Sequence, residues 1–260
     1  MVAYRLPCPR MKRPPLPRSV ARKLRQEAGF GCVICGNPII VYHHIIEWSE
    51  WHHFDPDHMT VLCPDHHAFA TNRSLSHEQV YEAKRHPANR RLAQGAFPFV
   101  NESPRFIVGT IGVVNCREIF RIGNKWLLRM SFRPRHGLLL DAQLFTRDNQ
   151  PLLRIWENEW HAFVSEAWDI IYNGKRLKVW HGPRDIGFDL TWDSEQKELT
   201  VYGKFEYEGA RLVCDKSGVQ VVDRSLKFTQ FSVEGWLTAF FVQTAKKEPI
   251  PKGTMFAFLA

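Results

Sequence analysis

Short apolar stretches follow one another at close intervals after residue 100, and in several of them every second residue is apolar. Leu199, Val201 and Phe205 alternate with polar residues, a period of two that is typical of a strand with one buried face. Asn173-Gly174 lies between two apolar arms and is the strongest local signal for a tight hairpin in the chain. We therefore predict an all-β domain, a sandwich or partly closed barrel, over residues 100–260, with strands near 105–114, 126–132, 138–145, 170–172, 177–180 and 198–207.

The first hundred residues have a different pattern, with short helices beside short strands. Ser19 and Gly29 bracket a helical stretch, and Ser76 followed by Gln79 has the spacing of a capping box for a helix over 76–84. Apolar runs at 38–42 and 59–62 predict two strands, and a further helix opens at about residue 63. The predicted fold class is α+β: a basic, proline-rich arm at 1–18, a small module at 19–99 and the all-β domain.

Composition bounds the class of protein. The apolar runs are only a few residues long, far short of the roughly 20 needed to cross a bilayer, so we expect no membrane span. The first residues carry several prolines where a signal peptide needs an apolar segment, so we expect a cytoplasmic protein. In a reducing compartment the six cysteines are better explained as metal ligands and free thiols than as a disulfide framework.

The net charge of +8 is unevenly placed. Residues 1–31 carry +7, residues 32–100 carry −2 and residues 101–260 carry +3. Nine of the twelve histidines lie between His43 and His86. The chain thus begins with a cationic segment that precedes a histidine-dense one, and its last part is nearly neutral.

Two pairs of potential metal ligands stand out in the histidine-dense segment. Cys32-x2-Cys35 is followed by Cys63-x2-His66, and each pair has the spacing with which a turn wraps one ion. Four such ligands predict a structural, tetrahedral Zn²⁺ site; the alternative is two loop thiols beside an unrelated histidine. Spacing assigns His66 rather than His67 to this site.

One tetrahedral ion does not account for His43-His44, His52-His53, His58 and His67, so a second site is implied. The segments Cys-Val-Ile-Cys-Gly, Tyr-His-His-Ile-Ile and Asp-His-Met-Thr-Val-Leu-Cys-Pro-Asp-His-His together resemble the HNH endonuclease family, whose ββα-metal motif is often bracketed by a zinc site. The resemblance covers about residues 20–90. Residues 100–260 resemble no family that we can name.

The resemblance implies a set of roles. His44 would be the general base that activates water, and His43 with His67 would hold the catalytic divalent cation. His58 stands where the family has its middle Asn, which helps to orient the base, so the triplet here reads His-His-His. Two imidazole ligands leave Mg²⁺, Mn²⁺, Ni²⁺ and Zn²⁺ open as the catalytic metal. We interpret His52 and His53 as exposed loop residues, although one of them could instead contact a substrate phosphate.

These expectations combine into a metal-dependent DNA endonuclease that acts on double-stranded DNA. Arg18, Arg22, Lys23 and Arg25 would contact phosphates, the alternative being a solvated charged face. The β domain would control or target the nuclease, bind a protein partner or mediate self-association, as in a defence system. Two alternatives remain open: a catalytically degenerate, zinc-stabilised nucleic-acid-binding module, and a sensor or partner-binding protein whose β domain carries the main function.

Overall fold

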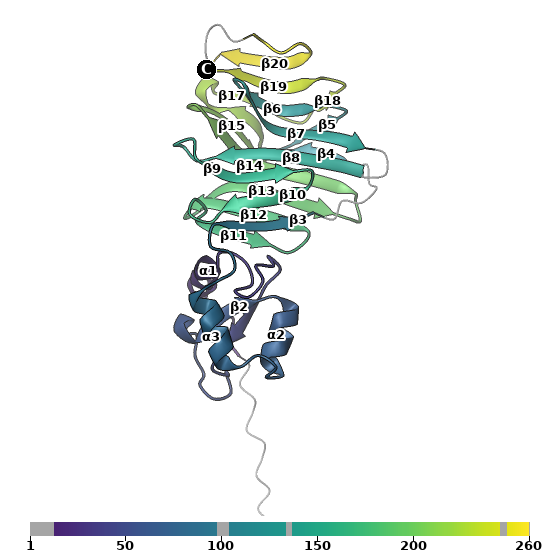
Figure 1. Cartoon of the computed structure of the whole chain (residues 1–260). Helices are drawn as coiled ribbons and strands as arrows, with labels where there is room; N and C mark the ends of the chain where they lie inside the picture. The colour runs from purple at the N-terminus through teal and green to yellow at the C-terminus, as the bar shows by residue number, and fades with distance from the viewer. Residues whose placement is uncertain (1–12, 98–103, 134–136, 245–248, 260) are drawn as a thin grey trace, which may run out of the picture.

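The computed structural model describes residues 13–97, 104–133, 137–244 and 249–259. Within these ranges the three α-helices all precede the first strand of the large sheets, and the rest of the described chain is mostly β-strand. The described chain is thus mostly β, with the helices gathered at one end of the molecule (Figure 1), which is compatible with the predicted α+β class. The longest described helix has 10 residues, and no described helix is long and apolar enough to span a membrane. Most of the predicted basic arm, residues 1–12, lies outside the described residues.

The N-terminal unit, residues 13–90, is built on a two-stranded antiparallel hairpin in which His43 faces Thr60 and His44 faces Met59. Leu24, Ile45 and Val80 are among the buried residues of its own small core. Ser76 caps the third helix and forms the predicted capping box with Gln79. The elements are α1 (Arg18–Glu27), β1 (Val41–His44), the 3₁₀ helix η1 (Pro56–His58), β2 (Met59–Leu62), α2 (Pro64–Thr71) and α3 (His77–Arg85).

An eight-stranded sheet forms one layer of the β part. Its order is β20 (Thr254–Leu259), β19 (Thr238–Gln243), β6 (Glu118–Ile122), β7 (Lys125–Arg133), β8 (Gly137–Phe145), β9 (Pro151–Trp156), β10 (Glu159–Phe163) and β3 (Leu92–Ala96). The pairs from β6 to β3 are antiparallel, whereas β19 runs parallel to both β6 and β20. The sheet thus begins at Leu92, upstream of the predicted boundary at residue 100, because β3 pairs along its whole length with β10.

The second sheet has ten strands. Seven follow one another as an antiparallel meander: β11 (Asp169–Tyr172), β12 (Arg176–Gly182), β13 (Asp185–Asp193), β14 (Glu198–Tyr207), β15 (Ala210–Asp215), β16 (Gly218–Val221) and β17 (Leu226–Phe228). The other three are β4 (Arg105–Val108), β5 (Ile111–Val114) and β18 (Ser232–Glu234), and a 3₁₀ helix, η2 (Val222–Arg224), precedes β17. Asn173-Gly174 forms the predicted hairpin turn between β11 and β12, with Gly174 at a φ of +84°.

The two sheets enclose one apolar core. Phe120 of β6 and Phe205 of β14 come from different sheets, and their ring centroids lie 4.9 Å apart. In β14 the residues alternate between buried and half-buried along most of the strand, as the period of two predicts. Stacking of the two layers is visible in Figure 1. The β part is therefore a sandwich of two large sheets.

The N-terminal unit is joined to the sandwich through α1, which lies beside β11 (Figure 1). Arg25 is buried and donates from Nε to Asp169 Oδ1 at 2.8 Å and from Nη2 to Oδ2 at 2.5 Å. Arg22 places its guanidinium carbon 4.2 Å from the centroid of the Trp168 ring. Phe30, just after α1, packs into the core of the sandwich. Charged and apolar contacts together hold the two parts against each other.

Candidate functional site

The first ligand pair lies on a tight turn after α1. The N–H of Cys32 donates to the carbonyl of Asn37 at 2.9 Å, and the N–H of Gly36 donates to the carbonyl of Cys32 at 2.8 Å. Gly36 has a φ of +76°, which favours glycine. The buried Asn89 donates from Nδ2 to the carbonyl of Gly36 at 3.1 Å. Backbone hydrogen bonds within the turn and the side chain of Asn89 thereby hold the turn that carries Cys32 and Cys35.

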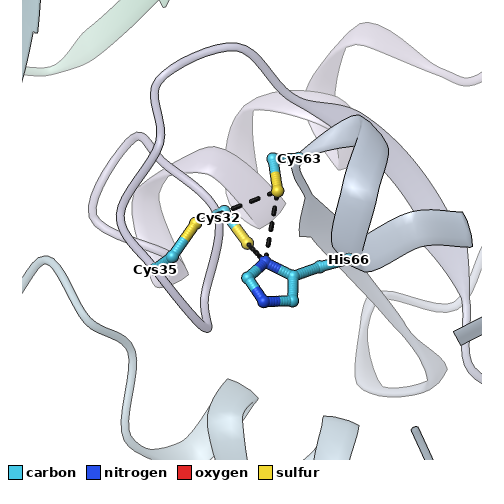
Figure 2. Close-up of side chains that lie close together, drawn as sticks. All are labelled: Cys32, Cys35, Cys63 and His66. Atoms are coloured by element: carbon cyan, nitrogen blue, oxygen red, sulfur yellow. Dashed lines mark hydrogen bonds between the residues drawn. The ribbon is translucent and has the colours of Figure 1, made fainter. Parts of the chain in front are cut away.

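The second pair lies at the start of α2. Cys63 is the N-cap of this helix and Pro64 its first residue, a position that proline favours because its missing N–H is not needed there. His66 follows one turn later and faces the cysteines (Figure 2). Its Nδ1 lies 3.2 Å from the sulfur of Cys63 and 3.5 Å from that of Cys32.

The four predicted zinc ligands thus come together. Their ligand atoms all lie within 4.8 Å of one another, and the sulfurs of Cys35 and Cys63 are 3.8 Å apart. Thiolates bound tetrahedrally at about 2.3 Å from one ion are separated by roughly 3.8 Å. Desolvation and the neighbouring Cys32 raise the pKa of Cys35 to about 11, so this thiol is protonated at pH 7 and would lose its proton on binding a cation. Cys32, Cys35, Cys63 and His66 could therefore bind a metal ion, and the donor set is consistent with structural zinc.

His43 and His67 form a second pair beside this cluster. Their ring centroids are 5.2 Å apart and the rings are nearly perpendicular, at 89°. Successive residues of an α-helix point about 100° apart, so α2 presents His66 to the cysteines and His67 to β1. Burial, and next the charge of His67, lower the pKa of His43 to about 4. His43 is therefore neutral at pH 7, the form that binds a metal.

His44, the next residue of β1, is buried and oriented by a backbone carbonyl. Its Nε2 lies 3.0 Å from the carbonyl oxygen of His53, and because a carbonyl only accepts, Nε2 carries the proton. The Nη2 of Arg13 lies 2.5 Å from Nδ1 and 3.0 Å from Nε2, so the guanidinium group is close to both ring nitrogens. Burial lowers the pKa of His44, and the charge of Arg13 lowers it further. At neutral pH the ring is thus a neutral acceptor at Nδ1.

His53 is not the exposed loop residue that we predicted. Its exposed fraction is 7%, because the ring of Trp51 stacks over it at a centroid distance of 4.4 Å. Nε2 donates to the carbonyl of Ile46 at 3.1 Å, and Nδ1 accepts from the N–H of Asp55 at 3.0 Å. His53 therefore fixes the loop whose carbonyl orients His44. The aromatic residues around it in the sequence were the available signal, since they can bury an imidazole, whereas His52 is exposed as expected.

The side chain of His58 contacts helix α3, whereas its place in the sequence predicted a contact with His44. Its Nδ1 lies 2.7 Å from the hydroxyl of Tyr81 on α3. Its backbone carbonyl accepts from the N–H of Ile45, the residue after His44, at 2.8 Å. Among the described contacts its side chain makes none to His43, His44 or His67. The side chain of His58 thus lacks the predicted contact with His44, and it is the backbone carbonyl of His53 that lies within hydrogen-bond distance of that ring.

The four cations predicted to contact nucleic acid fall into two groups. Arg25 is buried in its ion pair with Asp169, and Arg22 is half-buried on Trp168, so both contribute to the contact with the sandwich. Arg18 and Lys23 are exposed. The charge run alone did not reveal the difference, because Asp169 and Trp168 lie far away in the sequence.

The site therefore consists of four residues that could bind a metal ion, a perpendicular histidine pair and a buried, oriented histidine, carried by the turn after α1, the β1–β2 hairpin and the start of α2. Comparisons of the chain with protein-family models, with curated proteins and with solved structures give no significant match.

Proposed function

We propose that the N-terminal unit, which ends before β3 rather than at residue 99 as the sequence predicted, is a metal-dependent DNA endonuclease module of the HNH type. The observation that carries this proposal is the position of His44. It lies on a hairpin strand beside the His43–His67 pair, with one ring nitrogen bound to a carbonyl and the other free of a proton. Hairpin, helix and histidines follow one another in the order that the resemblance implies.

In this proposal His44 accepts a proton from the attacking water at Nδ1. A general base must be neutral at the working pH and held in one orientation, and burial and the His53 carbonyl give His44 these two properties. Arg13, whose Nη2 lies close to both ring nitrogens of His44, moves to a phosphate oxygen when substrate binds, where its charge offsets that of the phosphodiester. Exposed Arg18 and Lys23 contact the flanking phosphates of duplex DNA.

His43 and His67 are the residues that hold the catalytic cation. Two imidazole nitrogens bound to one ion at about 2.1 Å place their ring centroids roughly 5 Å apart, close to the observed 5.2 Å. A divalent cation bound there supplies charge neutralisation at the phosphate and the leaving oxygen. Imidazole ligands suit Ni²⁺ or Zn²⁺, and Mn²⁺ and Mg²⁺ stay open as the catalytic cation. The Cys32, Cys35, Cys63 and His66 cluster holds a separate, structural Zn²⁺.

The test is nicking of supercoiled plasmid by the full-length protein with each of the four cations. We expect nicking with at least one of them, and a loss of about 10²- to 10⁴-fold in His44→Ala, the usual contribution of a general base. His52→Ala is the matched control, because it removes an exposed imidazole from the adjoining loop. Nicking that persists in His44→Ala would exclude His44 as the base.

A second candidate function is nucleic-acid binding without cleavage. The observation that favours it is His58, whose ring is bound to Tyr81 rather than placed at the base. A protein that binds plasmid DNA tightly but nicks it with none of the cations would support this reading. Retention of binding in His44→Ala would complete that case.

A further inference from the structure

A cavity of about 620 Å³ opens on the eight-stranded sheet, outside the N-terminal unit. It is bounded by strands β7, β8 and β9, together with the segment that leads into β6. Ligand pockets in proteins typically enclose about 300–1,000 Å³, so this volume admits a small molecule. None of the residues assigned above to metal, catalysis or DNA lines it.

One wall of the cavity is cationic and held in place. Arg129 donates from Nε to Asp141 at 2.7 Å, and its guanidinium carbon lies 4.0 Å from the ring centroid of Trp126 and 5.0 Å from that of Trp156. Asp141 is buried and also accepts from the N–H of Glu157 at 2.7 Å. Arg129 is therefore held by Asp141 and against two aromatic rings before any ligand arrives, which lowers the entropic cost of binding.

Two further arginines add positive charge that a ligand can use. Arg117 is exposed and has no ion pair within the described residues. Arg133 pairs with Glu157 at 2.8 Å, but their side chains are 56% and 39% exposed. An exposed pair of this kind contributes little, so an anionic ligand can replace Glu157 as the partner of Arg133. Three arginines face two acids around the cavity, which leaves one surplus positive charge.

The same cavity also has an apolar, aromatic surface. Trp156 is 42% exposed and Phe132 is 55% exposed, although both are large and apolar. The guanidinium carbon of Arg154 also lies 5.3 Å from the centroid of the Trp156 ring, so the aromatic surface left to a ligand is the exposed part of Trp156 together with Phe132. This surface beside the arginines suits a ligand with a planar ring and a negative charge. We infer that the cavity binds a free nucleotide, with the base against Trp156 and Phe132 and the phosphate on Arg117, Arg129 and Arg133.

A nucleic-acid strand fits the cavity less well. Tracking a phosphate backbone requires many cations, whereas residues 101–260 carry a net charge of only +3 and the cavity lining a surplus of one. A single nucleotide needs only one cluster of guanidinium groups and one stacking face. The inference is independent of the proposed nuclease, since the two sites share no residue.

The experiment is calorimetric titration of the full-length protein with the four ribonucleoside triphosphates, AMP, adenosine and inorganic phosphate. We expect at least one nucleotide to bind more tightly than both adenosine and phosphate. Arg117→Ala should weaken that binding about tenfold or more, because it removes a charge-assisted contact. Lys216→Ala, which removes an exposed cation from the turn after β15, should leave binding unchanged. Trp156→Phe should retain most of the affinity that Trp156→Ala loses.

Three results would overturn the inference. One is the absence of nucleotide binding at millimolar concentration. Another is binding that Arg117→Ala and Trp156→Ala leave at the wild-type level, with the melting temperatures of the variants showing that they fold. The third is a single-stranded oligonucleotide that binds through Arg117 more tightly than any nucleotide, which would assign the cavity to nucleic acid. All three can be read whether or not the protein nicks plasmid.

Discussion

Among single residues, His53 shows how a side chain can position another residue of the proposed active site without taking part in the reaction. Its ring uses both nitrogens on the backbone of the 46–55 loop, so the loop closes around a buried imidazole. Its own carbonyl then becomes the acceptor for His44. The carbonyl of His53 can fix the orientation of His44 only if the loop itself is fixed. The side chain of His53 fixes this loop through its two hydrogen bonds.

Replacing His53 by Ala should therefore affect both stability and the proposed activity. The variant leaves the carbonyl of Ile46 and the N–H of Asp55 without their partner, and because both groups are only partly buried the loss should be about 1 kcal/mol, near the lower end for an unpaired polar group. We expect a lower melting temperature and at least a tenfold loss of nicking. His52→Ala, in the same loop but exposed, should change neither. Equal behaviour of the two variants would remove His53 from the positioning of His44.

Among the elements, α2 carries residues of both proposed metal sites. Its N-cap is Cys63, and its consecutive His66 and His67 face two different clusters. Eight residues are too few to form a stable helix alone in water, so α2 depends on its contacts. A metal ion on Cys63 and His66 would tie its first turn to the Cys32–Cys35 turn and thereby hold His67 beside His43.

Removal of this metal should affect the whole N-terminal unit. We expect wild-type protein to retain one tightly bound zinc by elemental analysis and Cys32→Ser to carry about one fewer, with a lower melting temperature, because structural zinc supplies folding free energy. Cys214→Ala is the control: this thiol is buried in the sandwich, burial raises its pKa far above the usual range, and it lies outside the cluster. Unchanged zinc content in Cys32→Ser would contradict the assignment.

The pairing of β3 with β10 requires a residue without a side chain at position 95. Gly95 faces Trp160, and a Cβ at position 95 would lie 2.7 Å from the indole nitrogen of this fully buried residue. Gly95→Ala should thus destabilise the sandwich by about 1–3 kcal/mol, the usual cost of overpacking. In Gly182→Ala the added Cβ meets nothing within 4 Å, so unfolding in urea should show no comparable loss. A neutral Gly95→Ala would mean that β3 can shift away from Trp160.

At the scale of the whole molecule, the sequence predicted features that depend on neighbouring residues but not the contacts between distant segments. The Asn173-Gly174 hairpin, the Ser76 capping box and the paired zinc ligands depend on residues that are close in the chain, and each was predicted. The parallel pairing of β19 with β6 and of β14 with β4 joins distant segments, and alternation along one strand does not specify its neighbour. Arg25 was misassigned for the same reason, since its partner Asp169 lies 144 residues away.

The Arg25–Asp169 pair also decides how firmly the N-terminal unit is joined to the sandwich. Both side chains are about nine-tenths buried, so removing one partner leaves an uncompensated charge. We expect Asp169→Asn to lower the free energy of unfolding by about 3–5 kcal/mol, whereas Arg25→Met with Asp169→Leu should cost less than the sum of the single changes.

The chain offers a control with the same shortest N···O distance and a different environment. Arg85 and Glu82 also lie 2.5 Å apart, but their side chains are 62% and 60% exposed. Glu82→Gln should therefore leave the urea midpoint nearly unchanged, because water solvates Arg85 once its partner is gone. If Asp169→Asn were as harmless as Glu82→Gln, water would reach Arg25 in the native protein, and the two parts of the molecule would be joined by their apolar contacts, such as Phe30, rather than by this ion pair.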